Sequence, residues 1–73
     1  MTPIELRDYM TSRPELAPSY KALRLLLRPG ETAMVTEDGG YRVWIRGAYR
    51  TMGPPATTLA TAIAALIAKL GRR

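Results

Sequence analysis

Apolar and polar positions alternate most regularly in the middle of the chain. Residues 32–37 and 41–46 each alternate along a short run, and Asp38-Gly39-Gly40 separates the two runs. Asp and Gly tolerate the positive φ angles of tight turns, so we predict two antiparallel strands joined as a β-hairpin. Gly47 predicts a bulge or a second turn, after which residues 48–51 either continue the second strand or form a third.

Segments with helical spacing lie on both sides of this hairpin. Apolar residues recur at helical spacing over residues 19–28, which predicts a helix that ends at Pro29-Gly30. A strand is the alternative there, but Leu26 breaks its alternation. Residues 57–70 predict a last helix, followed by Gly71, a residue type that favours the left-handed conformation after a helix. The two apolar stripes consist of Tyr20, Leu23, Leu26 and Leu27, and of Leu59, Ile63, Leu66, Ile67 and Leu70.

The N-terminal residues have the pattern of a capped helix. Thr2, Pro3 and Glu5 occupy the cap, first and third positions of a capping box, which predicts a short helix to about Met10. Pro18 can open the second helix in the same first-position role as Pro3.

The expected element order is helix, helix, strand, strand, an optional third strand, and helix. It predicts one α+β domain over residues 1–73, in which a small antiparallel hairpin or three-stranded sheet packs with two N-terminal helices and a C-terminal helix. A chain of 73 residues holds one small core, and without Phe that core is mainly aliphatic.

Several sequence features bear on the compartment. The chain has no cysteine, so nothing marks an oxidising environment. The start has no basic segment followed by an apolar run, as a signal peptide would. The uncharged residues 51–68 include Gly53-Pro54-Pro55, which leaves too short an apolar segment to span a bilayer. We therefore expect a cytoplasmic protein with no membrane partner.

Charge is distributed unevenly along the chain. All six acids lie in residues 1–38, beside five basic residues, whereas residues 39–73 carry six basic residues and no acid. Such one-sided charge attracts a polyanion or an acidic protein surface. The alternative is that these charges serve only solubility.

Residue types that carry catalysis are scarce. The absence of His and Cys excludes the usual nucleophile and base pairs, zinc sites and haem motifs. Glu37 and Asp38 are adjacent carboxylates, but acids are common at hairpin turns for conformational reasons. Gly39-Gly40 precedes a strand, not the Gly-Lys-Ser/Thr and helix of a phosphate loop. We predict no enzymatic activity, catalytic residue, metal, cofactor or small-molecule substrate.

The second strand of the hairpin is the main candidate for a functional site. Side chains alternate between the two faces of a strand, so Arg42, Trp44 and Arg46 share one face, and Arg50 can extend this row. Arginine binds phosphate or carboxylate bidentately, and an exposed tryptophan can stack on a base or fill a pocket on a protein. The alternative is that Trp44 is the largest core residue, with both faces of the sheet covered. The predicted partner-binding residues are Arg42, Trp44, Arg46, Tyr49 and Arg50.

The last predicted helix has a second notable face. Opposite its apolar stripe the side chains are small and nearly uncharged, at Thr57, Thr61, Ala64, Ala65, Ala68 and Arg72. Partner docking or self-association could use this face, and the high helix propensity of alanine explains it equally well. Lys69, Arg72 and Arg73 lie where basic residues complement the helix dipole.

In length and element order the whole chain resembles small bacteriophage proteins. The features that carry this resemblance are the Ala, Arg and Leu content, the two N-terminal helices, the hairpin over residues 32–46, and Gly53-Pro54-Pro55 before an Ala-rich helix. Among phage proteins the chain looks most like the regulators that bind host RNA polymerase, block initiation and suppress termination. The resemblance implies a non-enzymatic, protein-binding regulator in the host cytoplasm that contacts the polymerase near promoter or RNA elements.

Two other functions remain open. A nucleic-acid-binding module could use the same basic hairpin, although the chain lacks a helix-turn-helix signature and the aromatic pattern of RNA-recognition sheets. An inhibitor could block a host protein by mimicry, although mimics of DNA are acidic and this chain is basic.

Overall fold

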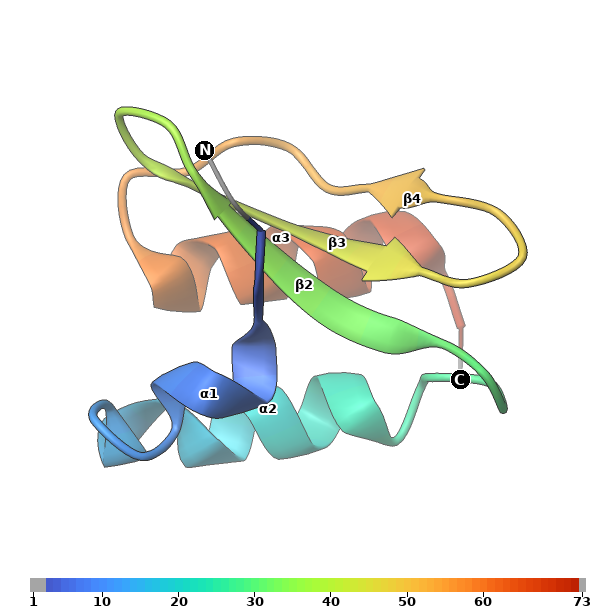
Figure 1. The fold of residues 1–73 in the computed structure, drawn as a ribbon, viewed down its shortest axis with the longest axis horizontal. Helices are drawn as coiled ribbons and strands as arrows, with labels where there is room; N and C mark the ends of the chain where they lie inside the picture. Colours follow the sequence, from blue (N-terminus) through green and yellow to red (C-terminus); the bar gives the residue numbers. More distant parts are fainter. Residues whose placement is uncertain (1–2, 73) are drawn as a thin grey trace.

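The structure confirms the predicted α+β class. It is a computed structural model that describes residues 3–72, so the predicted cap Thr2 and the terminal Arg73 lie outside the described residues. Four antiparallel strands form one sheet in the order β1-β2-β3-β4, and the helices pack against it (Figure 1). The strands are β1 (Ile4–Glu5), β2 (Thr32–Glu37), β3 (Tyr41–Arg46) and β4 (Thr51–Met52).

The central hairpin forms where the alternation predicts it. In the register of β2 and β3, Val35 lies opposite Val43 and Met34 opposite Trp44. Gly39 adopts a φ of 70°, the left-handed conformation that the tight turn requires. The two central strands of the sheet therefore form where the local sequence alone predicts them.

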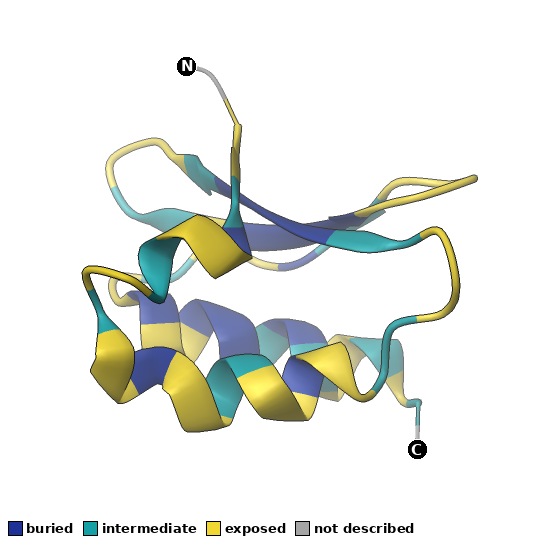
Figure 2. Ribbon diagram, turned by 60° about the horizontal axis from the view of Figure 1, so that its bottom comes forward, coloured by how far each residue is buried: buried dark blue, intermediate teal, exposed yellow. Residues whose placement is uncertain are grey.

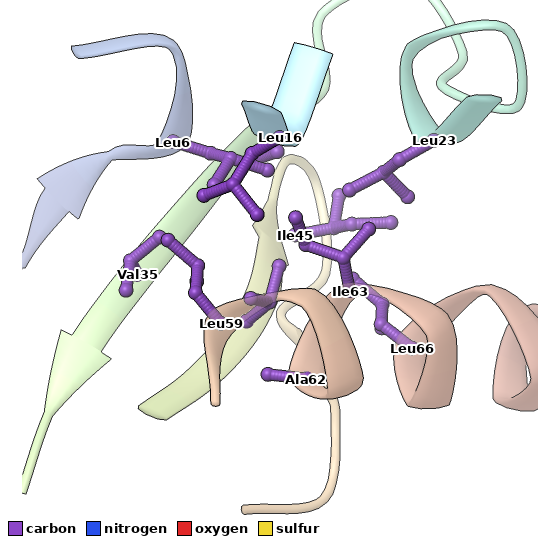
Figure 3. Close-up of a cluster of buried hydrophobic side chains, with 11 residues drawn as sticks. Leu6, Leu16, Leu23, Val35, Ile45, Leu59, Ala62, Ile63 and Leu66 are labelled. Atoms are coloured by element: carbon purple, nitrogen blue, oxygen red, sulfur yellow. The ribbon is translucent and has the colours of Figure 1, made fainter. Parts of the chain in front are cut away.

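All helices lie on one side of this sheet. They are α1 (Leu6–Tyr9), a 3₁₀ turn (Pro14–Leu16), α2 (Ala17–Arg24) and α3 (Leu59–Leu70). Figure 2 shows α2 and α3 side by side beneath the sheet, with α1 nearer to the strands. The core lies between the two layers and is mainly aliphatic, as predicted (Figure 3). Its buried residues are Leu6, Leu16, Leu23, Ala33, Val35, Val43, Ile45, Leu59, Ala62, Ile63 and Leu66.

The N-terminal helix begins later than predicted. Ile4 and Glu5 form a strand opposite Val35 and Met34, so pairing with β2 overrides the local helix signal of these residues. The helix itself runs only from Leu6 to Tyr9.

The second helix ends earlier than predicted, at Arg24. Beyond it the amides of Leu26 and Leu27 bond to carbonyls three residues back instead of four, which tightens the last turn. Leu25 is consequently 78% exposed, although it belongs to an apolar run.

A fourth, very short strand follows the hairpin. Residues 47–49 bend, and Thr51 and Met52 then pair with Ile45 and Trp44 of β3. The chain continues beside β3, where the Gly53 amide donates to the Val43 carbonyl and Ala56 bridges Tyr41. Pro54 and Pro55 occupy this edge segment.

The last helix begins two residues later than predicted. The side chain of Thr58 caps it by accepting the Thr61 amide at 3.2 Å. Gly71 ends it with a φ of 61°, as its residue type predicts.

Candidate functional site

The sheet face opposite the helices, called the outer face below, carries the predicted arginine row. Strand alternation and register place eight residues there: Glu5, Thr32, Met34, Thr36, Arg42, Trp44, Arg46 and Met52. The intervening residues Val43 and Ile45 are fully buried against the helices. No helix within residues 3–72 covers the outer face (Figure 2).

Trp44 lies on the outer face but is only 5% exposed, so the predicted exposed tryptophan is wrong. The alternative is confirmed in that Trp44 is buried, but its second helical layer is absent from residues 3–72, and Trp44 lies outside the main core cluster. Met34 and Met52 lie directly opposite Trp44 on the neighbouring strands. The indole Nε1 donates a hydrogen bond to Thr36 Oγ1 at 2.9 Å, which fixes the ring on the sheet.

Arg50 completes the cover of Trp44. Its guanidinium carbon lies 5.0 Å from the centroid of the indole ring, within the range of a cation–π contact. The neighbouring Tyr49 is 86% exposed, in the loop between β3 and β4. The structure therefore brings Trp44 and Arg50 together and leaves the Tyr49 ring in solvent.

The three arginines of this region make no ion pair within residues 3–72. Arg42, Arg46 and Arg50 are all exposed. Glu5 is the acidic residue of the outer face, and its carboxylate lies 3.5 Å from Arg7 Nε. Because its guanidinium lies over the Trp44 ring, Arg50 is counted with the outer face below, which thus carries three guanidinium groups whose donors are available to an external anion.

Two further basic residues of the acid-free half, Lys69 and Arg72, have partners within residues 3–72. Arg72 forms a bidentate pair with Glu31, with Nη1–Oε1 at 2.6 Å and Nη2–Oε2 at 3.1 Å. Lys69 donates a hydrogen bond to the Met52 carbonyl. Lys69 lies in the last turn of α3 and Arg72 follows it, where the sequence predicts only a dipole contribution. Within residues 39–72, the basic residues without an internal ion pair or side-chain hydrogen bond are therefore Arg42, Arg46 and Arg50.

A small hollow lies beside Arg42 on the outer face. Its volume is about 90 Å³, and Thr36, Asp38, Met52 and Pro55 contribute to its walls, so a carboxylate also lines it. Small-molecule sites usually measure about 300–1,000 Å³, so this hollow is much smaller than such a site.

The sequence did not predict the cover of Trp44 within this site, nor one ion pair outside it. The cover of Trp44 depends on Met52 and Arg50, which reach it only because the chain reverses at residues 47–49. The pairing of Arg72 joins residues 41 positions apart and has no local pattern. The available signal was the alternation of β2, which places Met34 and Thr36 on the same face as Trp44.

Comparison with known proteins gives no match for this chain among family models, curated proteins or solved structures. In the described part of the chain, no helix is both long enough and apolar enough to cross a bilayer.

Proposed function

We propose that this protein is a non-enzymatic binding domain whose outer face engages the phosphates of a nucleic acid. The observation that carries the proposal is the set of three unpaired, exposed arginines on a sheet face without a helical cover. Guanidinium groups bind phosphate oxygens bidentately, and phosphate contacts supply most of the non-specific affinity for nucleic acid.

The polarity of the outer face favours nucleic acid over a protein partner. A stable protein interface usually has an apolar centre, but Met34 and Trp44 are buried here and offer little apolar surface. Nucleic-acid interfaces are more polar and more positive than protein interfaces. Burial of Trp44 therefore changes the preferred partner from the protein that the resemblance implies to a nucleic acid.

A titration with two triple variants tests this proposal. The variant R42A/R46A/R50A removes the arginines of the outer face and leaves Trp44 in place. The matched control K21A/R24A/R28A removes three exposed basic residues from α2 and the turn after it. We expect the outer-face variant to lose binding to labelled oligonucleotides and the control to retain most of it. If both variants lost the same affinity, net charge alone would explain binding and the outer face would have no special role. Wild-type protein that binds no nucleic acid at low salt would refute the proposal.

Salt dependence gives a quantitative check on the same measurement. Each phosphate contact contributes a slope of about −0.7 in log affinity against log salt for single strands and about −0.9 for duplex. Three arginine contacts therefore predict a slope of about −2 to −3 for the wild-type protein. The outer-face variant should lose most of that slope, and the control should keep it.

A second candidate is the regulator of bacterial RNA polymerase that the resemblance implies. The observation in its favour is the exposed Tyr49 beside Arg50, because Tyr and Arg are enriched among residues that dominate protein interfaces. Affinity capture from nuclease-treated bacterial lysate, followed by mass spectrometry, tests it. Polymerase subunits should be recovered with wild-type protein and lost with Y49A. Recovery of abundant ribosomal proteins alone would exclude this candidate.

A further inference from the structure

We propose that Arg50 and Tyr49 form a subsite for one nucleotide of a single-stranded nucleic acid, in which Arg50 binds a phosphate and Tyr49 stacks on a base. This inference rests on the proposed function and adds to it the strandedness of the ligand and the residues that select it. The subsite lies in the loop between β3 and β4, at one end of the sheet (Figure 1).

Arg50 is positioned for its role before any ligand arrives. An exposed arginine on a loop normally samples many rotamers, and ordering it on binding costs free energy. Here the contact with the Trp44 ring restrains the guanidinium, and the bond from Trp44 to Thr36 restrains the ring. No side-chain hydrogen bond of Arg50 is found within residues 3–72, so its N–H donors can bind an oxyanion. A phosphate can therefore bind without displacing a partner of Arg50.

Tyr49 supplies the aromatic part of the subsite. Tyr49 is 86% exposed, and it is the only large aromatic residue within residues 3–72 that is so exposed. The side chains of Tyr9, Tyr20 and Tyr41 instead pack against the core. Tyr49 thus precedes the restrained Arg50 directly in the chain, and single-strand binding proteins combine aromatic rings with cationic groups in this way to hold successive nucleotides.

The same two residues argue for a single strand over a duplex. The ring of Tyr49 can stack only on a base whose face is free, and duplex bases stack on one another. A duplex could still contact Arg42, Arg46 and Arg50 through its phosphates, but it would gain nothing from Tyr49. The subsite therefore predicts a higher affinity for a single strand than for a duplex, which can be measured.

The experiment is a fluorescence anisotropy titration of a labelled oligothymidylate and a labelled duplex of the same length. The variants are Y49A, Y49F, R50A and R50K, and R24A is the matched control on the helical side. We expect Y49A to weaken binding of the single strand about tenfold or more and to leave duplex binding unchanged. Y49F should retain the wild-type affinity because it keeps the ring.

The arginine variants test the phosphate contact separately. R50A should reduce the salt slope for the single strand by about 0.7, the share of one phosphate. R50K should keep that slope but bind more weakly, because lysine lacks the planar, bidentate fork. Trp44 is the sole tryptophan, so its fluorescence should respond to the oligonucleotide in wild-type protein and in R24A, and much less in R50A.

The possible failures can be told apart. If the wild-type protein binds neither oligonucleotide, the proposed function fails together with this inference. If it binds both with equal affinity and Y49A has no effect, the proposed function stands and the single-strand subsite is wrong. Displacement of the oligothymidylate by a polyglutamate peptide at equal charge concentration would also overturn the subsite, because the face would then respond to carboxylates as well as it does to phosphates.

Discussion

Arg72 and Glu31 join the end of the last helix to the loop that leads into β2. Their side chains are mostly buried and meet through two hydrogen bonds, and Glu31 also accepts the Arg28 amide at 2.7 Å. Arg72 also donates a hydrogen bond to the Leu26 carbonyl at 3.2 Å. It therefore links the segment after α3 to the segment after α2 as well as to Glu31.

This pair predicts a loss of stability in acid. The Arg72 side chain, followed by the Arg28 amide, lowers the pKa of Glu31 below its usual value. A lowered pKa stabilises the folded state fully above the unfolded pKa of about 4.3, and that stability is lost as pH falls through the folded pKa. Urea unfolding measured from neutral to acidic pH should show this decline, and E31Q should lack most of it. E15Q is the control, since the exposed Glu15–Arg13 pair should contribute little.

Tyr9 predicts a second pH effect, at the alkaline end. Burial, followed by the hydrogen bond to Glu37, raises the pKa of Tyr9 to about 12. The usual value is about 10, so the folded state holds this proton longer, and the associated stability is lost as pH rises from about 10 toward 12. Ultraviolet titration should show one tyrosine that ionises late, and Y9F should remove that component. Identical titration curves for Y9F and wild type, after scaling for tyrosine number, would contradict the assignment.

Gly53 should not tolerate a side chain. A Cβ at this position would overlap the Val43 carbonyl oxygen and lie 3.2 Å from Leu66 Cβ. Because the position is buried, we expect Gly53→Ala to cost about 1–3 kcal/mol of unfolding free energy. Denaturant unfolding measures the change. Gly47→Ala is the milder comparison, since its Cβ would overlap no atom and would lie 3.1 Å from Glu31 Cγ and 3.8 Å from Glu31 Cα. It should cost less than Gly53→Ala, and an equal loss would contradict a steric cause.

The cover of Trp44 predicts its response to a soluble quencher. Wild-type Trp44 should be quenched weakly by acrylamide, because only 5% of its surface is exposed. R50A should increase the quenching without unfolding the protein, since it removes the group that lies 5.0 Å from the ring centroid. R24A should leave the quenching unchanged. Strong quenching of wild-type protein would show that the outer face is more open than the structure describes.

Parts of the fold follow from local sequence and parts do not. The β2–β3 hairpin was predictable because alternation and turn residues act within a few positions of one another. The strand at Ile4 was not, because its pairing with Val35 spans about thirty residues and a two-residue strand has no periodicity. Long-range pairing with β2 therefore makes Ile4 and Glu5 a strand, although their local sequence favours a helix.

The sequence also predicted part of the candidate site, namely the face on which its arginines lie. Strand alternation places Arg42 and Arg46 on one face, and the structure agrees. The burial of Trp44 was not predictable, because it depends on a chain reversal that brings Met52 and Arg50 back to the ring. The sequence predicted the composition of the face but not which of its side chains remain exposed.

The edges of the sheet restrict how this protein can associate. Both outermost strands are only two residues long, and the segment after β4 contains Pro54 and Pro55, which have no amide hydrogen to donate. Short edges and prolines hinder the addition of a further strand from another chain. Growth of the sheet into fibres or strand-swapped dimers is thereby disfavoured.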